Sequence, residues 1–401
     1  HPSVIVWSIG NEVSEAWKSD NEGIDKARML NDIVKSLDPG RPTLVACQQG
    51  FQDKFGEVTD LVGYNYLEPR MIADHRRRPH RKMMVTEAFV YYSGLREDLV
   101  RDFVEENPWH FSEENDFIAG SFVWAGVDYL GESSPWPAKG WCSCPFDMTL
   151  KERPQAAYYH TAWQPDKEYL KLVVRDNCFD QPSGTDHWQY PPMADTWDLP
   201  YTDSRCVQIR CYTTCDSVQF FFPMWSNPQL PLKPRITKDY PDNCITLQLP
   251  ARRGKVLAVG YKNGVAVMRD SLVNHGDVAG ARLDFEGCVR LSSIPADMTP
   301  ATSGKHRATA TTLRLTLTDS LGRIQQMQPR RFSVRTEGPL RLLGVETGDM
   351  RRTDSWRTTE LNTYFGEGLI RLQSTTQSGT GRVIVDVEGF DQPFVKELTI
   401  E

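Results

Sequence analysis

The stretch Val4-Ile-Val-Trp-Ser-Ile-Gly-Asn11-Glu12 decides how the chain folds, because six of its first seven residues are apolar and an amide and a carboxylate follow. A run that is apolar on both faces predicts a buried strand in a parallel sheet. Polar residues at the carboxyl end of such a strand lie where α/β barrels place their chemistry. Glu12 is therefore the first candidate catalytic residue. The alternative is that Glu12 only caps a helix that begins near Asn21.

A second short apolar strand, Lys82-Met-Met-Val-Thr-Glu87-Ala-Phe, also ends in a carboxylate. Hydrolysis of a glycosidic bond needs one carboxyl group to protonate the leaving oxygen and a second to attack the sugar or activate water. In retaining enzymes the two lie about 5 to 5.5 Å apart. Because the ends of neighbouring barrel strands can provide that distance, Glu87 is the second candidate catalytic residue.

Strands and helices alternate around these two segments. Apolar residues follow a helical period from Glu22 to Leu37, and Asp38-Pro-Gly-Arg-Pro42 ends that helix. Further strands are predicted at 43–47, 61–65, 83–86 and 118–124, and further helices at 96–106 and 152–163. This alternation predicts a parallel sheet. A closed barrel needs eight βα units, and the chain has only five, so two sheet edges are expected to be open.

After Gln164-Pro165 the helical periods end and short strands separated by Pro- and Asn-rich joints take over. The first group of predicted strands covers 169–174, 206–213, 217–222, 244–249 and 255–261, and the second covers 312–318, 331–335, 340–345, 369–374 and 381–387. Both groups are typical of β-sandwiches. The predicted fold class is α/β plus all-β, with an α/β domain at 1–165 and β-sandwich domains at 166–281 and 282–401.

The composition of the chain excludes several function classes. It has 401 residues, of which 39% are hydrophobic and 25% charged, a balance typical of soluble proteins. The net charge of −7 disfavours nucleic acid as a partner, and no run of 18 apolar residues suggests a membrane span. The nine cysteines fit no zinc pattern, so we expect mostly buried free thiols and no metal, even where Cys206, Cys211 and Cys215 lie close together.

The segments HPSVIVWSIGNE and MMVTEAF resemble the acid/base and nucleophile signatures of glycoside hydrolase family 2, the β-galactosidase and β-glucuronidase group. The pieces LAVGYKNGVAVMRD (257–270) and GPLRLLGVETGD (338–349) are similar to accessory β-domains of bacterial members. The resemblance implies the C-terminal part of a (β/α)8 TIM barrel, beginning at strand four, followed by two immunoglobulin-like sandwiches. It also leads us to expect a cut N-terminus, with earlier domains missing.

The resemblance assigns a role to each glutamate. Glu12 matches the general acid/base, and Glu87 matches the nucleophile that forms a glycosyl-enzyme intermediate. Glu12 must then keep its proton near neutral pH, so we expect it in a partly desolvated setting beside a negative charge. Glu87 must stay ionised, with hydrogen-bond donors around it.

Three substrate-binding residues follow from the same resemblance. Asn11 matches an asparagine that hydrogen-bonds the sugar 2-hydroxyl, with a strand-end turn as the alternative role. Tyr66 is similar to the tyrosine that orients the nucleophile, although the alignment also allows Tyr64. Trp124 would form the aromatic platform on which the sugar stacks, with core packing as the alternative.

Asp128 and Glu132, in the loop after Trp124, are further candidates for substrate contact. The basic run His75-Arg-Arg-Arg-Pro-His-Arg-Lys82 precedes the Glu87 strand and so belongs on the opposite face of the barrel, where we interpret it as a solvated helix end. With no other signature for binding a carboxylate, the sequence favours a neutral hexose over a glucuronide.

The resulting hypothesis is a retaining exo-β-glycosidase that acts on an oligosaccharide or polysaccharide, with β-D-galactosides favoured and without a cofactor. β-Glucuronidase and β-mannosidase activities remain open. So does a rival from another class, a non-catalytic remnant whose sandwiches bind carbohydrate or act as scaffolding. A homo-oligomer is compatible with the sequence, and the family resemblance suggests a periplasmic or secreted bacterial protein.

Overall fold

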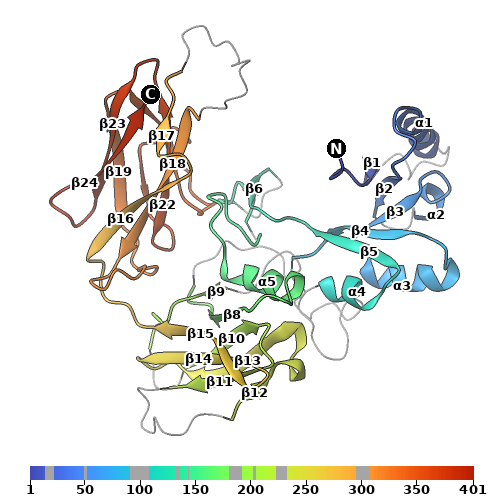
Figure 1. Cartoon of the computed structure of the whole chain (residues 1–401), viewed down its shortest axis with the longest axis horizontal. Coiled ribbons are helices and arrows are strands. Elements are labelled where there is room, and N and C mark those ends of the chain that lie inside the picture. Colours follow the sequence, from blue (N-terminus) through green and yellow to red (C-terminus); the bar gives the residue numbers. More distant parts are fainter. Residues whose placement is uncertain are drawn as a thin grey trace.

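A computed structural model describes the chain in ten stretches. They are residues 1–13, 22–48, 52–90, 108–131, 136–142, 144–179, 192–201, 205–222, 233–294 and 308–401. These stretches form an α/β part followed by two all-β parts, as the sequence predicts (Figure 1). Within them, no helix combines the length and the apolar character that crossing a membrane would require.

The α/β part contains one five-stranded parallel sheet, in which the strands lie in chain order. Its strands are β1 (Trp7–Asn11), β2 (Thr43–Cys47), β3 (Leu61–Asn65), β4 (Met83–Ala88) and β5 (Ile118–Val123). The sheet is open, with β1 at one edge and β5 at the other. Since all the strands are parallel, their carboxyl ends lie side by side at one end of the sheet. The two predicted glutamates also lie at this end.

Helices follow most of the strands. They are α1 (Glu22–Leu37), α2 (Gln52–Phe55), α3 (Glu68–Arg77), α4 (Trp109–Glu114) and α5 (Ala157–Trp163), with a 3-10 turn, η2 (Pro154–Ala156), before α5. The α1 helix has the predicted bounds and ends before the Asp38-Pro-Gly turn. The helix predicted at 152–163 is shorter, because Pro154 opens a 3-10 turn instead. The helix predicted at 96–106 lies outside the described residues.

The prediction that the first strand is buried was wrong. The β1 strand begins at Trp7 rather than Val4, and it pairs with β2 alone. As a result, the side chain of Trp7 is 41% exposed and that of Ile5 64% exposed. An apolar pattern on both faces shows that a strand can be buried on both sides. Whether it is buried depends on which neighbouring elements pack against it.

The first all-β part is a sandwich of two four-stranded sheets. One sheet has the order β13 (Cys244–Pro250), β10 (Cys206–Thr213), β8 (Leu170–Arg175), β9 (Met193–Ala194), and the other β12 (Arg235–Ile236), β11 (Ser217–Phe221), β14 (Lys255–Lys262), β15 (Val265–Val273). Two 3-10 turns, η3 (Thr237–Asp239) and η4 (Pro241–Asn243), precede β13. Leu172, Trp197 and Phe220 fill the core between the sheets and are fully buried.

The second all-β part packs a four-stranded sheet against a five-stranded one. The first sheet has the order β16 (Gly280–Glu286), β18 (Ala310–Thr318), β22 (Glu367–Ser374), β20 (Leu340–Glu346). The second has the order β17 (Arg290–Leu291), β24 (Phe394–Ile400), β23 (Gly379–Val387), β19 (Arg331–Glu337), β21 (Glu360–Asn362). Because Gly280 pairs with Thr318, we propose that the boundary expected at 281/282 lies before Gly280.

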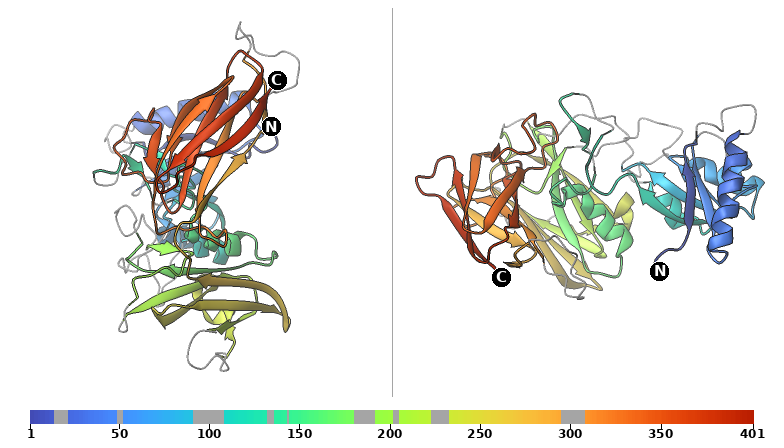
Figure 2. Two further views of the ribbon diagram at one scale, coloured as in Figure 1. Left: turned by 90° about the vertical axis from the view of Figure 1, so that its left-hand side faces the viewer. Right: turned by 90° about the horizontal axis from the view of Figure 1, so that it is seen from above.

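A segment without long strands joins the parallel sheet to the sandwiches. It includes the small hairpin of β6 (Tyr129–Leu130) and β7 (Gly140–Trp141), and it continues to α5. Figures 1 and 2 show this part of the chain, in green, between the parallel sheet and the two sandwiches. All nine cysteines are free thiols, and six of them are buried, as the sequence predicts for most.

Candidate active site

The carboxyl ends of β1, β3 and β4 bring five polar side chains to one edge of the sheet. Glu12 directly follows β1, Tyr66 directly follows β3, and Glu87 lies at the end of β4. Backbone hydrogen bonds hold these ends together: the Glu12 N–H donates to Ala46 O at 3.0 Å, and the Tyr66 N–H donates to Glu87 O at 2.7 Å. Asn11 and Asn65 complete the group.

Asn65 connects the first strand end to the rest of the group. Its Nδ2 donates to Glu12 Oε1 at 2.9 Å and to Asn11 Oδ1 at 3.0 Å. Its Oδ1 accepts from the Thr86 hydroxyl at 2.6 Å, and the residue is fully buried. A buried amide with three partners has one available orientation, so Asn65 holds Glu12 and Asn11 in position. Sequence reasoning missed this residue, although it stands directly before Tyr66 in a stretch already singled out.

Tyr66, and not Tyr64, contacts Glu87. The Tyr66 hydroxyl donates to Glu87 Oε2 at 2.6 Å, whereas the fully buried Tyr64 donates to Asp74 Oδ2 at 3.0 Å. Side chains alternate along a strand, but Tyr66 has a φ of +57° and so turns out of the strand. Glu12 also has a positive φ, of +48°. Non-glycine residues in this conformation are uncommon and are enriched at functional sites.

Burial and neighbouring charge set the ionisation of the Glu87–Tyr66 pair. Burial raises the pKa of Glu87, and so does the negative charge of Glu12, while the hydrogen bonds from Tyr66, Asn11 and Asn65 oppose both effects. Burial and the Glu87 carboxylate raise the pKa of Tyr66 far above its ordinary value. The proton therefore stays on the Tyr66 hydroxyl, which donates to Glu87. Hydrogen-bond donors surround Glu87 as expected, but its raised pKa works against the ionised form that a nucleophile needs.

The surroundings of Glu12 differ from the expectation. We expected a partly desolvated side chain, but Glu12 is exposed in the described part of the chain. The physical reason is its position at the end of an edge strand, where only one neighbouring strand can cover it. The expected negative neighbour is present, because Glu12 and Glu87 interact electrostatically.

Trp124 stands at the end of β5, beside the end of β4. Its backbone N–H donates to Ala88 O at 3.0 Å, and its side chain is 36% exposed, so core packing does not account for it. The indole Nε1 donates to the Tyr129 hydroxyl at 2.8 Å, and the two rings meet edge to face with centroids 5.9 Å apart. Tyr129 therefore lies beside Trp124 and fixes the orientation of its indole ring. Sequence reasoning missed Tyr129.

Asp128 is buried rather than turned toward solvent. It accepts two hydrogen bonds from Arg153, at 2.8 and 2.6 Å, and a third from the backbone N–H of Cys144 at 3.1 Å. We therefore propose that Asp128 holds the loop after Trp124 in place, instead of the substrate contact expected for it. Glu132, the other candidate in this loop, lies outside the described residues.

The basic run lies away from this edge, as expected, although not all of it is solvated. Helix α3 ends at Arg77, and Arg77 pairs with Asp74. Arg81, by contrast, has a side chain only 7% exposed and pairs with Asp53. Asp53 also pairs with Arg78, so the carboxylates of Asp53 and Asp74 are each shared among several arginines of this region.

Two family models match the chain: the TIM barrel domain of glycosyl hydrolases family 2 over residues 1–133, and glycoside hydrolase family 2 C-terminal domain 5 over residues 297–396. Together they cover more than half of the chain. They agree with the predicted fold class, a part of a barrel followed by all-β domains.

Among curated proteins, the chain is similar to beta-galactosidase BoGH2A of Bacteroides ovatus, with 22% identity over 99% of this chain and 49% of that protein. It is also similar to a beta-glucuronidase of Sus scrofa, with 23% identity over 44% of this chain and 31% of that protein. The chain thus spans about half the length, or less, of these two relatives.

Solved structures extend the likeness of fold to the whole chain. A glycosyl hydrolase family 2 member from Bacteroides cellulosilyticus superposes with a TM-score of 0.83 at 24% identity, over 100% of this chain and 50% of that one. A beta-glycosidase from Bacteroides vulgatus superposes with a TM-score of 0.74 at 20% identity, over 100% of this chain and 51% of that one. At these identities the likeness establishes the fold.

Proposed function

The chain belongs to glycoside hydrolase family 2, and we propose that the protein is a retaining exo-β-glycosidase that releases terminal β-D-galactosyl residues. The observation that carries this proposal is the hydrogen-bonded group of Glu12, Asn65, Tyr66 and Glu87 at one sheet edge. Two carboxyl groups with different surroundings are what a double displacement requires.

In the first step, Glu87 attacks the anomeric carbon while Glu12 transfers its proton to the leaving glycosidic oxygen. A covalent glycosyl-enzyme ester forms, and the glycosidic C–O bond breaks. This removes the negative charge of Glu87, and Glu12, having given up its proton, is left as a carboxylate. In the second step, Glu12 takes a proton from water, the water oxygen attacks the same carbon, and Glu87 leaves as a carboxylate.

The hydrogen bond from Tyr66 to Glu87 supports this division of roles. A phenol that keeps its proton directs one lone pair of the carboxylate, so the other oxygen is oriented for attack. The exposed face of Trp124 supports a sugar platform beside it, and Tyr129 fixes the orientation of the indole.

Two observations favour a galactoside over a glucuronide. The named β-galactosidase aligns with 99% of this chain, whereas the named pig β-glucuronidase aligns with 44%. The basic run directly precedes β4 and so lies at the opposite end of the parallel sheet from Glu12 and Glu87, remote from the proposed sugar site.

The test is covalent trapping with the full-length protein. It is incubated with 2-fluoro galactosyl fluoride or 2-fluoro glucuronyl fluoride, whose adducts differ in mass, and analysed by intact-protein mass spectrometry and peptide mapping. We expect a single galactosyl adduct on Glu87. An adduct on another residue would refute the assigned nucleophile, and a glucuronyl adduct alone would refute the sugar.

A pair of matched variants accompanies this test. Glu87→Gln should lower kcat on the order of a thousandfold or more, because it removes the nucleophile. The control Glu57→Gln makes the same chemical change at an exposed position beside α2 and should keep wild-type activity. Substantial turnover by the Glu87→Gln variant would contradict the proposal.

A further inference from the structure

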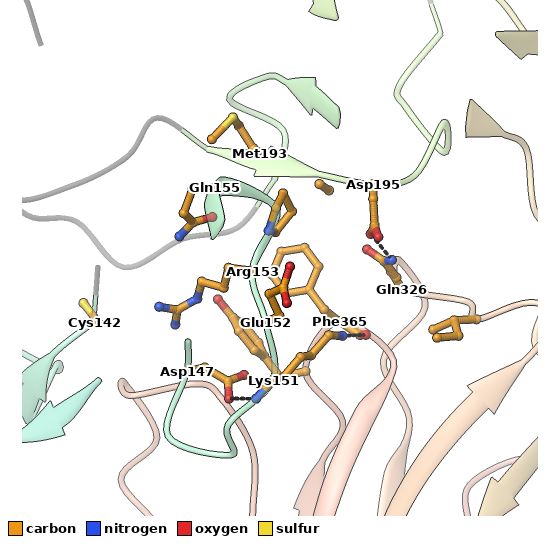
Figure 3. A pocket seen from close by; sticks show the side chains of 14 residues that line it. Cys142, Asp147, Lys151, Glu152, Arg153, Gln155, Met193, Asp195, Gln326 and Phe365 are labelled. Carbon is orange, nitrogen blue, oxygen red and sulfur yellow. Dashed lines mark hydrogen bonds between the residues drawn. The ribbon is translucent and has the colours of Figure 1, made fainter. Parts of the chain in front are cut away.

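A cavity of about 110 Å³ lies where the three parts of the chain meet (Figure 3). We call it the junction cavity. Its wall combines residues from the segment before α5, from β9 and the turn after it, and from the second sandwich. The lining includes Arg153, Gln155, Met193, Asp195, Gln326 and Phe365. Neither Glu12 nor Glu87 lines it.

Hydrogen bonds across the part boundaries build this wall. Lys151 Nζ donates to Phe365 O at 3.2 Å and pairs with Glu367 at 3.0 Å, which joins the segment before α5 to the second sandwich. Gln326 Nε2 donates to Asp195 Oδ1 at 2.6 Å and joins the two sandwiches. The junction cavity is therefore framed by defined contacts rather than left between loosely apposed surfaces.

The charged groups of the wall already have partners outside it: Lys151, Arg153 and Asp195 in ion pairs, Asp147 through hydrogen bonds from Thr149, and Glu152 through His160. Arg153 pairs with Asp128 at 2.6 Å, Lys151 with Glu367, and Asp195 with Lys171 at 2.7 Å. A charged ligand would lose its hydration here and find these counter-charges already engaged, which is costly. The charge pattern thus favours a neutral ligand.

Gln155 indicates which neutral chemistry fits. Its side chain is 2% exposed, and its Oε1 has no hydrogen-bond partner among the described residues, while Nε2 donates weakly to Cys144 O at 3.4 Å. A buried acceptor without a donor is unfavourable, and a ligand hydroxyl would satisfy it. Met193 and Phe365 add apolar surface on other sides of the cavity, suited to the C–H face of a sugar ring.

We propose that the junction cavity binds a neutral saccharide, with Gln155 Oε1 accepting a hydrogen bond from one of its hydroxyls. This site goes beyond the proposed catalytic function, because its occupation requires neither Glu12 nor Glu87. A bound sugar would contact all three parts of the chain at once and so oppose their separation.

The experiment measures sugar binding to the full-length protein in a Glu87→Gln background, so that no probe is consumed. The probes are methyl β-D-galactoside and methyl β-D-glucoside, with glucuronate as the charged comparison. Binding is measured by calorimetry and saturation-transfer NMR. Three substitutions are compared. Gln155→Leu alters the junction cavity, and Trp124→Ala alters the proposed catalytic site. Gln377→Leu makes the same Gln-to-Leu change at an exposed position and is the control.

We expect a neutral probe to bind the Trp124→Ala protein and the Gln377→Leu protein with similar affinity. Gln155→Leu should weaken binding of the neutral probe to the junction cavity about fivefold to tenfold, because one hydrogen bond is lost. Glucuronate should bind the junction cavity more weakly than either neutral probe.

Binding that persists in Gln155→Leu but disappears in Trp124→Ala would overturn the inference and leave the proposed catalytic function intact. Absence of neutral-sugar binding to the Trp124→Ala protein would also overturn it. Should Gln155→Leu fail to fold by circular dichroism, Ile324→Phe adds bulk to the same wall from a half-buried position and should reduce binding in the same way.

Discussion

The buried pair of Asp128 and Arg153 allows a quantitative test of how the loop after Trp124 is held. The side chain of Asp128 is fully buried and that of Arg153 is 13% exposed, and two hydrogen bonds join them. The perturbation is a double-mutant cycle: Asp128→Leu, Arg153→Met, and both together.

The magnitude follows from burial. Removing one partner leaves the other as an uncompensated charge inside the protein, and each single variant should lose about 3 to 5 kcal/mol of unfolding free energy. The double variant replaces both charges by apolar groups of similar size and should lose no more than about 1 to 2 kcal/mol. Since single domains have only about 5 to 15 kcal/mol in total, the contrast is easily measured.

The assay is urea unfolding of the 401-residue chain, followed by tryptophan fluorescence. An exposed cross-strand pair, Arg335 and Asp386, provides the control: Asp386→Ala should cost less than about 1 kcal/mol. Equal and additive losses in the Asp128 cycle would refute the reasoning. In activity assays, a stable double variant with an unchanged KM would support the role in holding the loop, whereas a raised KM would support the substrate contact that we expected for Asp128.

Three further predictions concern the end of the parallel sheet that carries Glu12 and Glu87. Tyr66→Phe removes the donor that lowers the pKa of Glu87, so kcat should fall about tenfold and the acid limb of the pH–kcat/KM profile should move to higher pH; an unmoved limb would contradict the assigned contact. Asn65→Ala removes the two hydrogen bonds to Glu12 and Asn11, and kcat/KM in steady-state assays should fall about 10- to 100-fold, more than in Thr86→Ser. Because burial raises the pKa of Glu87 in the folded state, its ionisation lowers stability as pH rises through that pKa. Glu87→Gln should therefore raise Tm at pH 7, and the gain should vanish at a pH below the ordinary glutamate value; equal gains at both pH values would oppose this.

Local sequence patterns predicted the elements that depend on local physics. The bounds of α1, β2 and β3 agree with the predictions, because helical period, strand alternation and turn residues are encoded within a few positions. The two strand-end glutamates were also found this way, since a carboxylate after an apolar strand is visible without knowledge of the partners. The change from βα alternation to short strands after Pro165 predicted the all-β parts.

Contacts between distant residues needed the tertiary structure. Asn65 lies 53 residues from Glu12, and Asp128 lies 25 residues from Arg153, so no local pattern reveals these partners. For the same reason, sequence reasoning did not find Arg153 as the partner of Asp128, and it took Val4–Gly10 for a buried strand. Whether a side chain is covered depends on which elements pack over it.

The sequence alone thus determined the fold class, the strand ends and the pair of candidate carboxylates, because these depend on the order of apolar and polar residues along the chain. The tertiary structure decided which tyrosine contacts Glu87, what holds Glu12, and that a cavity exists between three parts of the molecule. Such features depend on packing between segments far apart in the chain, such as those of Lys151 and Phe365, which are 214 positions apart. Side-chain periodicity does not encode such packing.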